Sequence, residues 1–268
     1  KSQGVTDQDE SCMSISYYFG SSSKVWEDIS WIYGIEEAGY SGWEICADGS
    51  YHFGKRDQYE RIIETLQSTT LKATVHAPFG DLNPAAINDP IWRETIRQLC
   101  ECVRLASEIT NRVTIHPGYL SCTGKLVPGK IWQLQKEAMR EVGKTATEYG
   151  VVACLENMPD IHDFLCRYPE EIQGIIEDIE GVSMTIDFGH AHTMGKVKDF
   201  IKVLKSASHV HIHDNNGKSD EHLAIGEGTV DWNLLSKALL RDYRGVVVVE
   251  GRSIPEAKLS LSRIRGWR

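Results

Sequence analysis

The sequence predicts a single-domain α/β protein, a (β/α)8 barrel of the TIM type. Eight short runs rich in β-branched residues alternate with longer segments in which apolar residues recur every three to four positions. The 268 residues match the ~250 that such a barrel takes, and no linker rich in Pro, Gly or Ser divides them. An open nucleotide-binding sheet would favour a G-x-G-x-x-G turn after its first strand, and none occurs there.

The elements follow in a regular order along the chain. The expected strands span residues 15–19, 42–47, 72–76, 112–116, 152–156, 183–187, 209–213 and 245–250. The expected helices span residues 25–38, 60–68, 91–108, 131–149, 169–177, 197–206 and 232–240. Each helical segment carries an apolar stripe, such as Ile96, Leu99 and Val103, that would cover the outside of the strands.

Composition narrows the classes of protein to which the chain can belong. Residues 1–12 are polar and lack the apolar core of a signal peptide, so we interpret them as a tag or disordered extension before a barrel over 13–268. The seven cysteines include no C-x-x-C pair, which favours reduced thiols in a cytoplasmic protein. No apolar run reaches ~18 residues, so no membrane span is expected. The net charge of -9, without a basic run, argues weakly against a nucleic-acid partner.

Residues that can bind a metal stand at the ends of six consecutive expected strands. In chain order they are His76, His116, Glu156, Asp187 with His190 just beyond it, the H-V-H-I-H run of His209, His211 and His213, and Glu250. A parallel barrel brings these ends together around one axis, where crowded carboxylates and imidazoles would repel or stay unsatisfied. A divalent cation resolves both problems, and mixed oxygen and nitrogen donors suit Zn²⁺, Mn²⁺, Co²⁺, Fe²⁺ or Mg²⁺.

Two further features bear on this cluster. Side chains alternate faces along a strand, so His209, His211 and His213 share one face. The segment after the seventh strand carries Asp220 and His222 at D-x-H spacing, which would add ligands if it folded back over the site. An ordinary solvated turn explains that segment equally well.

Five motifs give the chain a resemblance to a known superfamily. They are VHAPFGDLNP, LENMP, IDFGH, HIHDNNGKSDEHLAIGEG and VVVVEG. The chain resembles the xylose isomerase-like TIM barrel superfamily from residue 39 to residue 251. This group includes sugar and sugar-phosphate isomerases and epimerases, inosose dehydratases and the apurinic endonucleases of the endonuclease IV type.

The resemblance implies ligands and roles for particular residues. In the epimerase branch it implies one metal held by Glu156, Asp187, His211 and Glu250, with the two glutamates as the acid/base pair. In the endonuclease branch it implies three zinc ions with additional ligands at His76, His116, His190, Asp220 and His222. The expected cofactor is therefore a divalent metal, Zn or Mn first, in one to three copies.

The expected function is a divalent-metal-dependent isomerase or epimerase of a small sugar or sugar phosphate, working by proton transfer through a metal-stabilised enediolate. Two alternatives remain: a zinc phosphodiesterase acting on abasic DNA, and a barrel that binds sugar without turnover. Trp43, Glu44 and His213 are the expected substrate contacts, although packing between strand and helix is the alternative for Trp43. A homo-oligomer is compatible with the sequence.

Overall fold

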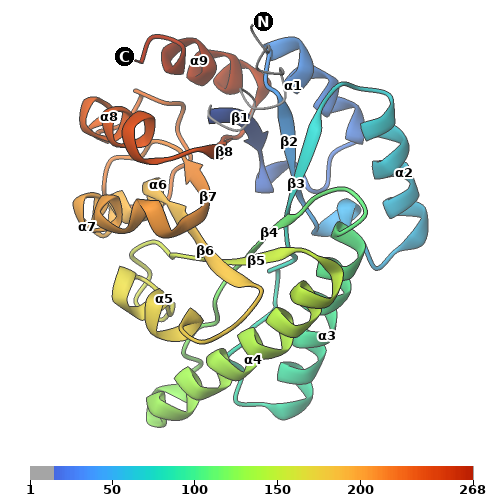
Figure 1. Ribbon diagram of the computed structural model, residues 1–268, viewed down its shortest axis with the longest axis vertical. Coiled ribbons are helices and arrows are strands. Elements are labelled where there is room, and N and C mark those ends of the chain that lie inside the picture. Colours follow the sequence, from blue (N-terminus) through green and yellow to red (C-terminus); the bar gives the residue numbers. More distant parts are fainter. Residues whose placement is uncertain (1–14, 268) are drawn as a thin grey trace, which may run out of the picture.

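Eight parallel strands close into one barrel in the computed structural model, which describes residues 15–267 (Figure 1). The strands are β1 (Ile15–Gly20), β2 (Gly42–Cys46), β3 (Lys72–His76), β4 (Arg112–Ile115), β5 (Val152–Glu156), β6 (Val182–Asp187), β7 (Ala207–Ile212) and β8 (Gly245–Glu250). The predicted fold class is therefore confirmed, and each expected strand is present to within two residues at either end. The extension predicted over residues 1–12 lies outside the described residues.

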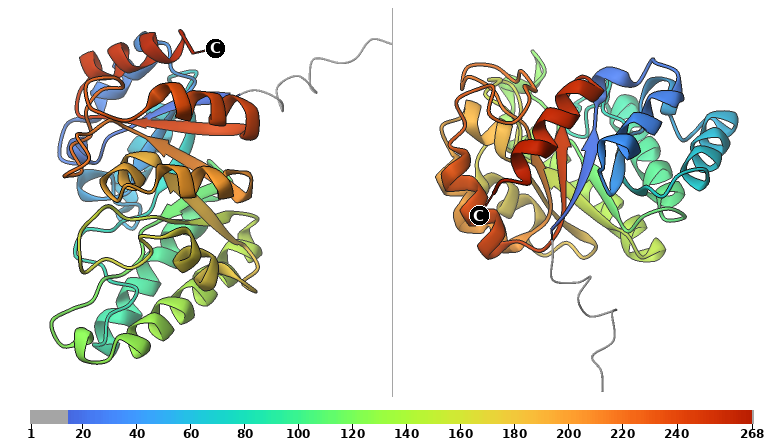
Figure 2. Two further views of the ribbon diagram at one scale, coloured as in Figure 1. Left: turned by 90° about the vertical axis from the view of Figure 1, so that its left-hand side faces the viewer. Right: turned by 90° about the horizontal axis from the view of Figure 1, so that it is seen from above.

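Helices surround the strands on the outside of the barrel, as the views in Figure 2 show. They are α1 (Tyr33–Ala38), α2 (Arg56–Gln67), α3 (Asp89–Ala106), α4 (Pro128–Tyr149), α5 (Pro169–Ile176), α6 (Phe188–Thr193), α7 (Val197–Val203), α8 (Trp232–Asp242) and α9 (Ile254–Ile264). Two of them, α6 and α9, were absent from the sequence prediction. Capping side chains begin several helices: Asn88 accepts from the Ile91 N–H before α3, and Asp231 accepts from the Leu234 N–H before α8.

The expected helix over residues 25–38 is wrong for its first half. Only Tyr33–Ala38 is α-helical, and Ile29–Ile32 forms a single 3-10 turn before it. The cause is local, because the Asp28 carboxylate accepts from the Ser30 N–H at 3.0 Å and turns the chain there. Ile29 and Ile32 are buried all the same, so the apolar spacing that suggested a helix reflects packing of a tighter turn.

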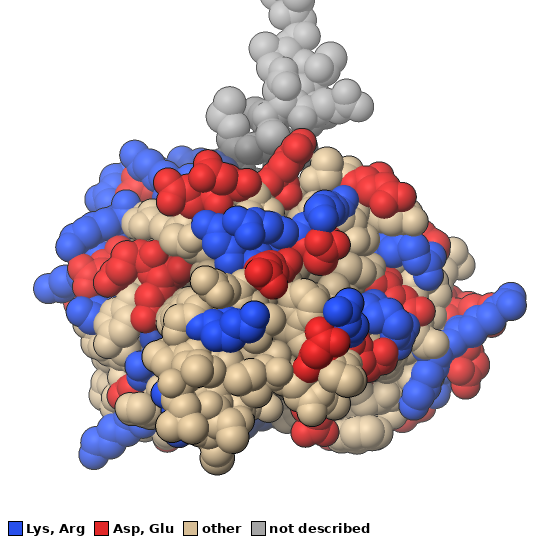
Figure 3. All heavy atoms as spheres, turned by 90° about the horizontal axis from the view of Figure 1, so that it is seen from below, with Lys and Arg blue, Asp and Glu red and all other residues tan. Residues whose placement is uncertain are grey.

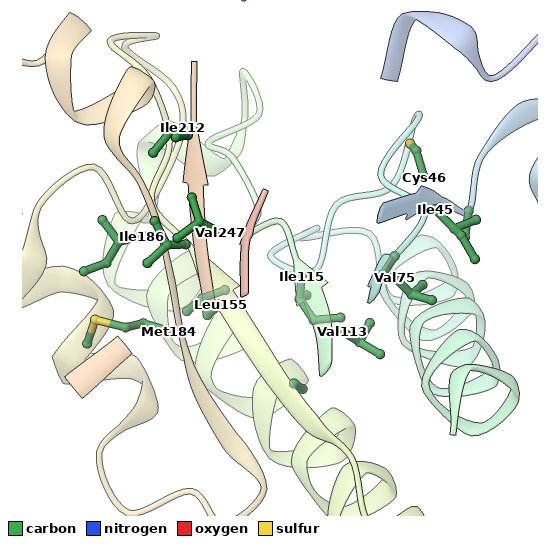
Figure 4. Packing of buried hydrophobic residues seen from close by; sticks show 14 of the residues in the cluster. Ile45, Cys46, Val75, Val113, Ile115, Leu155, Met184, Ile186, Ile212 and Val247 are labelled. Atoms are coloured by element: carbon green, nitrogen blue, oxygen red, sulfur yellow. The ribbon is translucent and has the colours of Figure 1, made fainter. Parts of the chain in front are cut away.

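The apolar core lies between the strands and the helices. Strand side chains that point outward, among them Val75, Ile115 and Leu155, pack there (Figure 4). The barrel interior is largely polar by contrast: Thr114 Oγ1 lies 3.0 Å from Thr185 Oγ1, and both residues are buried. Because the two faces of each strand alternate, the same register that buries the aliphatic residues directs polar side chains to the barrel axis.

The surface carries no sign of a polyanion-binding face in the view of Figure 3, where Lys and Arg are interspersed with Asp and Glu. Within residues 15–267, no helix is long and apolar enough to cross a membrane.

Candidate active site

Three carboxylates from three strands converge on one ring nitrogen of His211. His211 Nδ1 lies 2.8 Å from Glu156 Oε1, 3.4 Å from Glu250 Oε1 and 4.0 Å from Asp187 Oδ2. Strand register explains why these side chains lie close together. Asp187 is paired with His211 across β6 and β7, and all four residues lie at or next to the ends of their strands. Glu250 is the most accessible of the four, with 14% of its side chain exposed. We call these four residues the central cluster.

The central cluster has the donor set of a divalent-cation site. Asp187 Oδ2 and His211 Nδ1 are buried, and neither makes a hydrogen bond of good geometry within residues 15–267, although Nδ1 is close to Glu156 Oε1. Leaving such groups unsatisfied in a dry interior is costly, and three carboxylates side by side add repulsion. Three oxygen donors and one imidazole nitrogen suit a divalent metal ion, so the residues present fit the cofactor that the sequence suggested.

Glu44 lies on the other side of the His211 ring. Its Oε1 is 2.7 Å from His211 Nε2, while its Oε2 accepts from Thr74 Oγ1 at 2.8 Å and is 2.7 Å from His209 Nε2. Burial alone would raise the pKa of Glu44, but the neighbouring His211 and His209 hold it well below its usual range. Both oxygens of Glu44 are thus occupied by protein groups, which orients His211 with Nδ1 toward the carboxylates.

Two histidines flank the central cluster beside Glu156. Glu156 Oε2 lies 3.0 Å from His116 Nε2 and 3.3 Å from His76 Nε2, and the His76 Nδ1 atom is 2.9 Å from the Ala77 carbonyl oxygen. The Phe79 ring stacks on His116, with centroids 4.4 Å apart. One donor atom from each of His76, His116 and Glu156 lies within 4.8 Å of the other two, which is close enough for the three to bind one metal ion.

A second flanking cluster forms around Asp220. The carboxylate of Asp220 lies 3.3 Å from His190 Nε2, 3.2 Å from His213 Nε2 and 3.1 Å from His222 Nε2. These four residues again offer donor atoms within 4.8 Å of one another. His190 is oriented from behind, since its Nδ1 atom is 2.7 Å from the Asn157 carbonyl oxygen.

The segment that carries Asp220 and His222 is held over the barrel by Asp214. The Asp214 backbone pairs with Leu223, and its carboxylate accepts from the Gly226 and Val230 N–H groups and from Trp232 Nε1. An anchored carboxylate with this many donors fixes the path of the whole segment. The segment therefore folds back over the site, and the solvated-turn alternative is wrong for it.

The two glutamates of the central cluster have pKa values displaced in opposite directions. Burial would raise the pKa of Glu156, but His211, His116 and His76 hold it well below its usual range. Burial raises the pKa of Glu250, and its contacts with His211 and His222 do not offset this. Carboxyl groups whose environments separate their pKa values are typical of an acid and base pair.

A cavity of about 240 Å³ opens at the mouth of the barrel. Glu156 and Glu250 line it, together with apolar side chains that include Phe79, Met158 and Phe164. The reacting part of a small molecule can therefore reach both glutamates of the central cluster.

Residues 33–267 match the family model described as the xylose isomerase-like TIM barrel. The chain belongs to this family.

Members of the xylose isomerase-like TIM barrel family resemble the chain over most of its length. The uncharacterized protein MJ1311 of Methanocaldococcus jannaschii is 32% identical over 231 residues, which are 83% of this chain and 78% of that protein. The crystal structure of a D-tagatose 3-epimerase-like protein, 31% identical, superposes with a TM-score of 0.86 and covers 94% of this chain and 96% of its own. Fructoselysine 3-epimerase of Shigella flexneri is 23% identical over 80% of this chain and 81% of its own length.

The structure brings together nine of the residues that sequence analysis expected to bind metal. They are Glu156, Asp187, His211, Glu250, His76, His116, His190, Asp220 and His222. Their assignment as ligands stays a prediction. Sequence analysis missed the supporting groups, such as Asn157, whose side chain bonds to both the N–H and the carbonyl oxygen of Asp187; its place beside Glu156 in LENMP was the available signal.

The positions of the Trp43 and His213 side chains contradict their expected role as substrate contacts. Trp43 is 1% exposed and points into the helical layer, where it packs edge-on against Trp31 and Tyr51. Its neighbour Glu44 occupies the inner face, so alternation along β2 excludes Trp43 from the mouth cavity. His213 is fully buried beneath His222, whose ring stacks on it at 4.1 Å, and reaches Asp187 and Asp220 but not the cavity.

A glycine in the family motif IDFGH makes room for His213. A Cβ placed on Gly189 would lie 2.1 Å from Cε1 of the His213 ring. We therefore expect Gly189→Ala to push this ring out of place, lower the melting temperature by several degrees and reduce metal content, as measured by thermal denaturation and elemental analysis. Gly174→Ala on α5, where a Cβ meets nothing within 4 Å, is the matched control. Its melting temperature and metal content should equal those of the unmodified protein.

Proposed function

We propose that the protein is a divalent-metal-dependent carbohydrate epimerase that moves a proton on a carbon next to a carbonyl group. The observation that carries this proposal is the convergence of Glu156, Asp187 and Glu250 on His211 Nδ1 at the mouth of a closed barrel. These four residues would hold the metal ion. When bound there, a divalent cation supplies Lewis-acid polarisation of the substrate's carbonyl and hydroxyl oxygens.

Glu156 and Glu250 would perform the proton transfers. Both line the mouth cavity, and both approach His211 Nδ1 from different strands, so a substrate carbon held above them faces two carboxyl groups. One of these two carboxyl groups would accept the carbon-bound proton and the other would deliver one, since both line the cavity in which the substrate carbon would lie. Acid and base assistance of this kind contributes about 10²–10⁴-fold to a rate.

Relatives support the proposal. A D-tagatose 3-epimerase-like protein and a fructoselysine 3-epimerase both resemble the chain over most of its length. Resemblance to these proteins does not by itself establish which reaction this chain catalyses, because proteins with the same barrel fold catalyse many different reactions. The acid and base pair within the central cluster is what makes an epimerase the function that best fits the site.

The direct test is exchange of a substrate proton with solvent. Purified protein loaded with Mn²⁺, Co²⁺ or Zn²⁺ is incubated in D2O with D-tagatose, D-fructose and D-psicose, and NMR follows deuterium entry and the appearance of epimers. Deuterium at the carbon next to the carbonyl, with formation of the epimer, is the expected result. Binding of a ketose without any exchange would contradict the proposal and favour the non-catalytic barrel.

Metal-assisted phosphodiester hydrolysis is the second candidate, and the two flanking clusters favour it. His76 and His116 beside Glu156, and His190 and His222 around Asp220, supply donors for further ions. Several neighbouring ions suit the clamping of both the attacking and the leaving oxygen of a phosphoryl group. Cleavage of a duplex with one abasic site by the zinc-loaded protein, together with three zinc ions per chain, would replace the first candidate by this one.

Removal of the metal should change how stability depends on pH. Burial lowers the pKa of His213, but Asp187 and Asp220 outweigh it and raise the pKa to about 9. The stability contributed by this raised pKa is present below about pH 6.5 and is lost as pH rises through about 9, so the melting temperature of the chelator-treated protein should fall across this interval.

Metal should have the opposite effect over the same interval, because a ligating imidazole must be neutral. The melting temperature gained on adding Mn²⁺ should therefore grow from pH 6.5 to pH 9 in scans with and without EDTA. A gain that shrinks over this interval would contradict the assignment of the histidines to metal sites.

A further inference from the structure

A second cavity adjoins the mouth cavity and has no role in proton transfer. It has a volume of about 260 Å³ and shares three wall residues with the mouth cavity: Phe79, His116 and Phe164. Because His116 Nε2 lies 3.0 Å from Glu156 Oε2, the second cavity begins one side chain away from a member of the proposed acid and base pair.

Most of the side chains around the second cavity are apolar, while polar atoms contribute almost half of its accessible wall. Apart from the shared residues, the wall consists of Pro78, Leu82, Pro84, Leu99, Pro117, Tyr119 and Asp81. An apolar cavity of ~150 Å³ is already large enough to hold a benzene ring, so this cavity has room for an aromatic or branched aliphatic group.

Hydrogen bonds between loops hold the second cavity open. Asn83 accepts from the Tyr119 N–H at 3.1 Å and donates to the Tyr119 carbonyl oxygen at 3.1 Å, which ties the loop after β3 to the loop after β4. Leu165 N–H donates to the Gly118 carbonyl oxygen, and Tyr119 pairs with Phe164, which ties in the loop after β5. A preformed cavity spares a ligand the cost of ordering these loops.

Neither cavity offers a basic side chain to an anionic substrate. Among residues 15–267, no Lys or Arg lines the mouth cavity or the second cavity, and Asp81 is a charged wall residue of the second cavity. Phosphate groups are normally held by Arg or Lys side chains. The basic side chains on the loop after β5 and facing it are engaged elsewhere: Arg167 with Asp160 at 3.4 Å and Lys125 with Asp163 at 2.7 Å.

We propose that the substrate is an unphosphorylated ketose derivative whose apolar substituent lies in the second cavity. This inference rests on the proposed function, because it extends the substrate held by the same site. The polar end of the substrate lies at Glu156 and Glu250, and the substituent lies between Phe79, Leu82 and Tyr119. The substituent supplies binding energy remote from the reacting carbon, which an enzyme can use to orient that carbon.

A comparison of four substrates tests the inference. The Mn²⁺-loaded protein is assayed in D2O with D-fructose, D-fructose 6-phosphate, 1-O-benzyl-D-fructose and 6-O-benzyl-D-fructose, and kcat/KM for deuterium entry is measured for each. Burial of an aromatic group should raise kcat/KM for one benzyl ether about 10-fold to 100-fold above D-fructose, and the phosphate should react more slowly than D-fructose. A phosphate that reacts best, or benzyl ethers no better than D-fructose, would overturn the inference while leaving the proposed function intact.

A variant that fills the cavity makes the test specific. Leu82 is half-buried and lines the second cavity only. Leu82→Trp should reduce the kcat/KM ratio of benzyl ether to D-fructose toward one, whereas Ile91→Trp, at a position 51% exposed on α3, should preserve the ratio. An undiminished ratio in Leu82→Trp would place the substituent elsewhere and reject the second cavity as its site. Absence of deuterium entry with every substrate would reject the proposed function, and this inference with it.

Discussion

Replacing Glu156 or Glu250 by Gln is expected to lower kcat for proton exchange by about 10²–10⁴-fold. Gln keeps the shape of the side chain but can neither accept nor deliver the proton. Loss of a charged ligand adds to the effect in both variants, since each carboxylate lies within 3.4 Å of His211 Nδ1. The measurement is deuterium entry into a ketose at saturating metal, with metal content determined on the same sample.

The matched control is Glu148→Gln, which removes one carboxylate from an exposed position near the end of α4. Its kcat should equal that of the unmodified protein. Full activity in the Glu156 variant would remove that residue from proton transfer, and the same holds separately for Glu250. Loss of metal without loss of rate at saturating metal would leave the ligand role but reject the acid and base role.

Glu44→Gln should weaken metal binding about 10-fold to 100-fold, the usual consequence of losing a carboxylate that orients a ligating histidine. The neutral amide removes the charge 2.7 Å from His211 Nε2 and places an amide group where two histidine nitrogens now meet one carboxylate. Calorimetric titration of the metal-free protein with Mn²⁺ or Co²⁺ measures the change in Kd.

The same variant separates two interpretations of Glu44. If Glu44 contacts substrate, as the sequence suggested, KM for the ketose should rise at saturating metal while Kd for metal stays constant. If it positions His211, Kd for metal should rise while KM at saturating metal changes little. Thr74→Val removes only one hydrogen bond to Glu44, worth ~1 kcal/mol, and should raise Kd for metal by about tenfold at most.

The fold was accessible from sequence because hydrophobic periodicity determines which face of each element is buried. Strand runs such as Lys72–His76 and Val152–Glu156 have the bounds expected, since β-branched residues between turns are a strong local signal. The segment around Asp28 was wrongly predicted to be α-helical. The Asp28 side chain accepts from the Ser30 N–H and stabilises a tight turn there, while the spacing of the apolar residues still resembles that of a helix. Short α6 was missed because it begins directly after β6, inside the motif IDFGH.

Site residues at strand ends were predictable for the same reason as the strands. Alternation placed His209, His211 and His213 on one face, and the closed barrel brought their neighbours to the same axis. Roles were harder to assign. Trp43 and Glu44 are adjacent in sequence, yet one packs under the helices and the other lies inside the barrel, and only the register of β2 decides which.

By itself, the sequence determined the barrel class, the family motifs and the set of ionisable residues at the strand ends, because these depend on local pattern and composition. Tertiary structure alone decided that three carboxylates meet one nitrogen of His211, that Glu44 lies behind that ring, and that loops after three strands enclose a second cavity. The physical reason is that distances between side chains on different strands follow from register, barrel closure and loop hydrogen bonds, none of which is a property of a single segment.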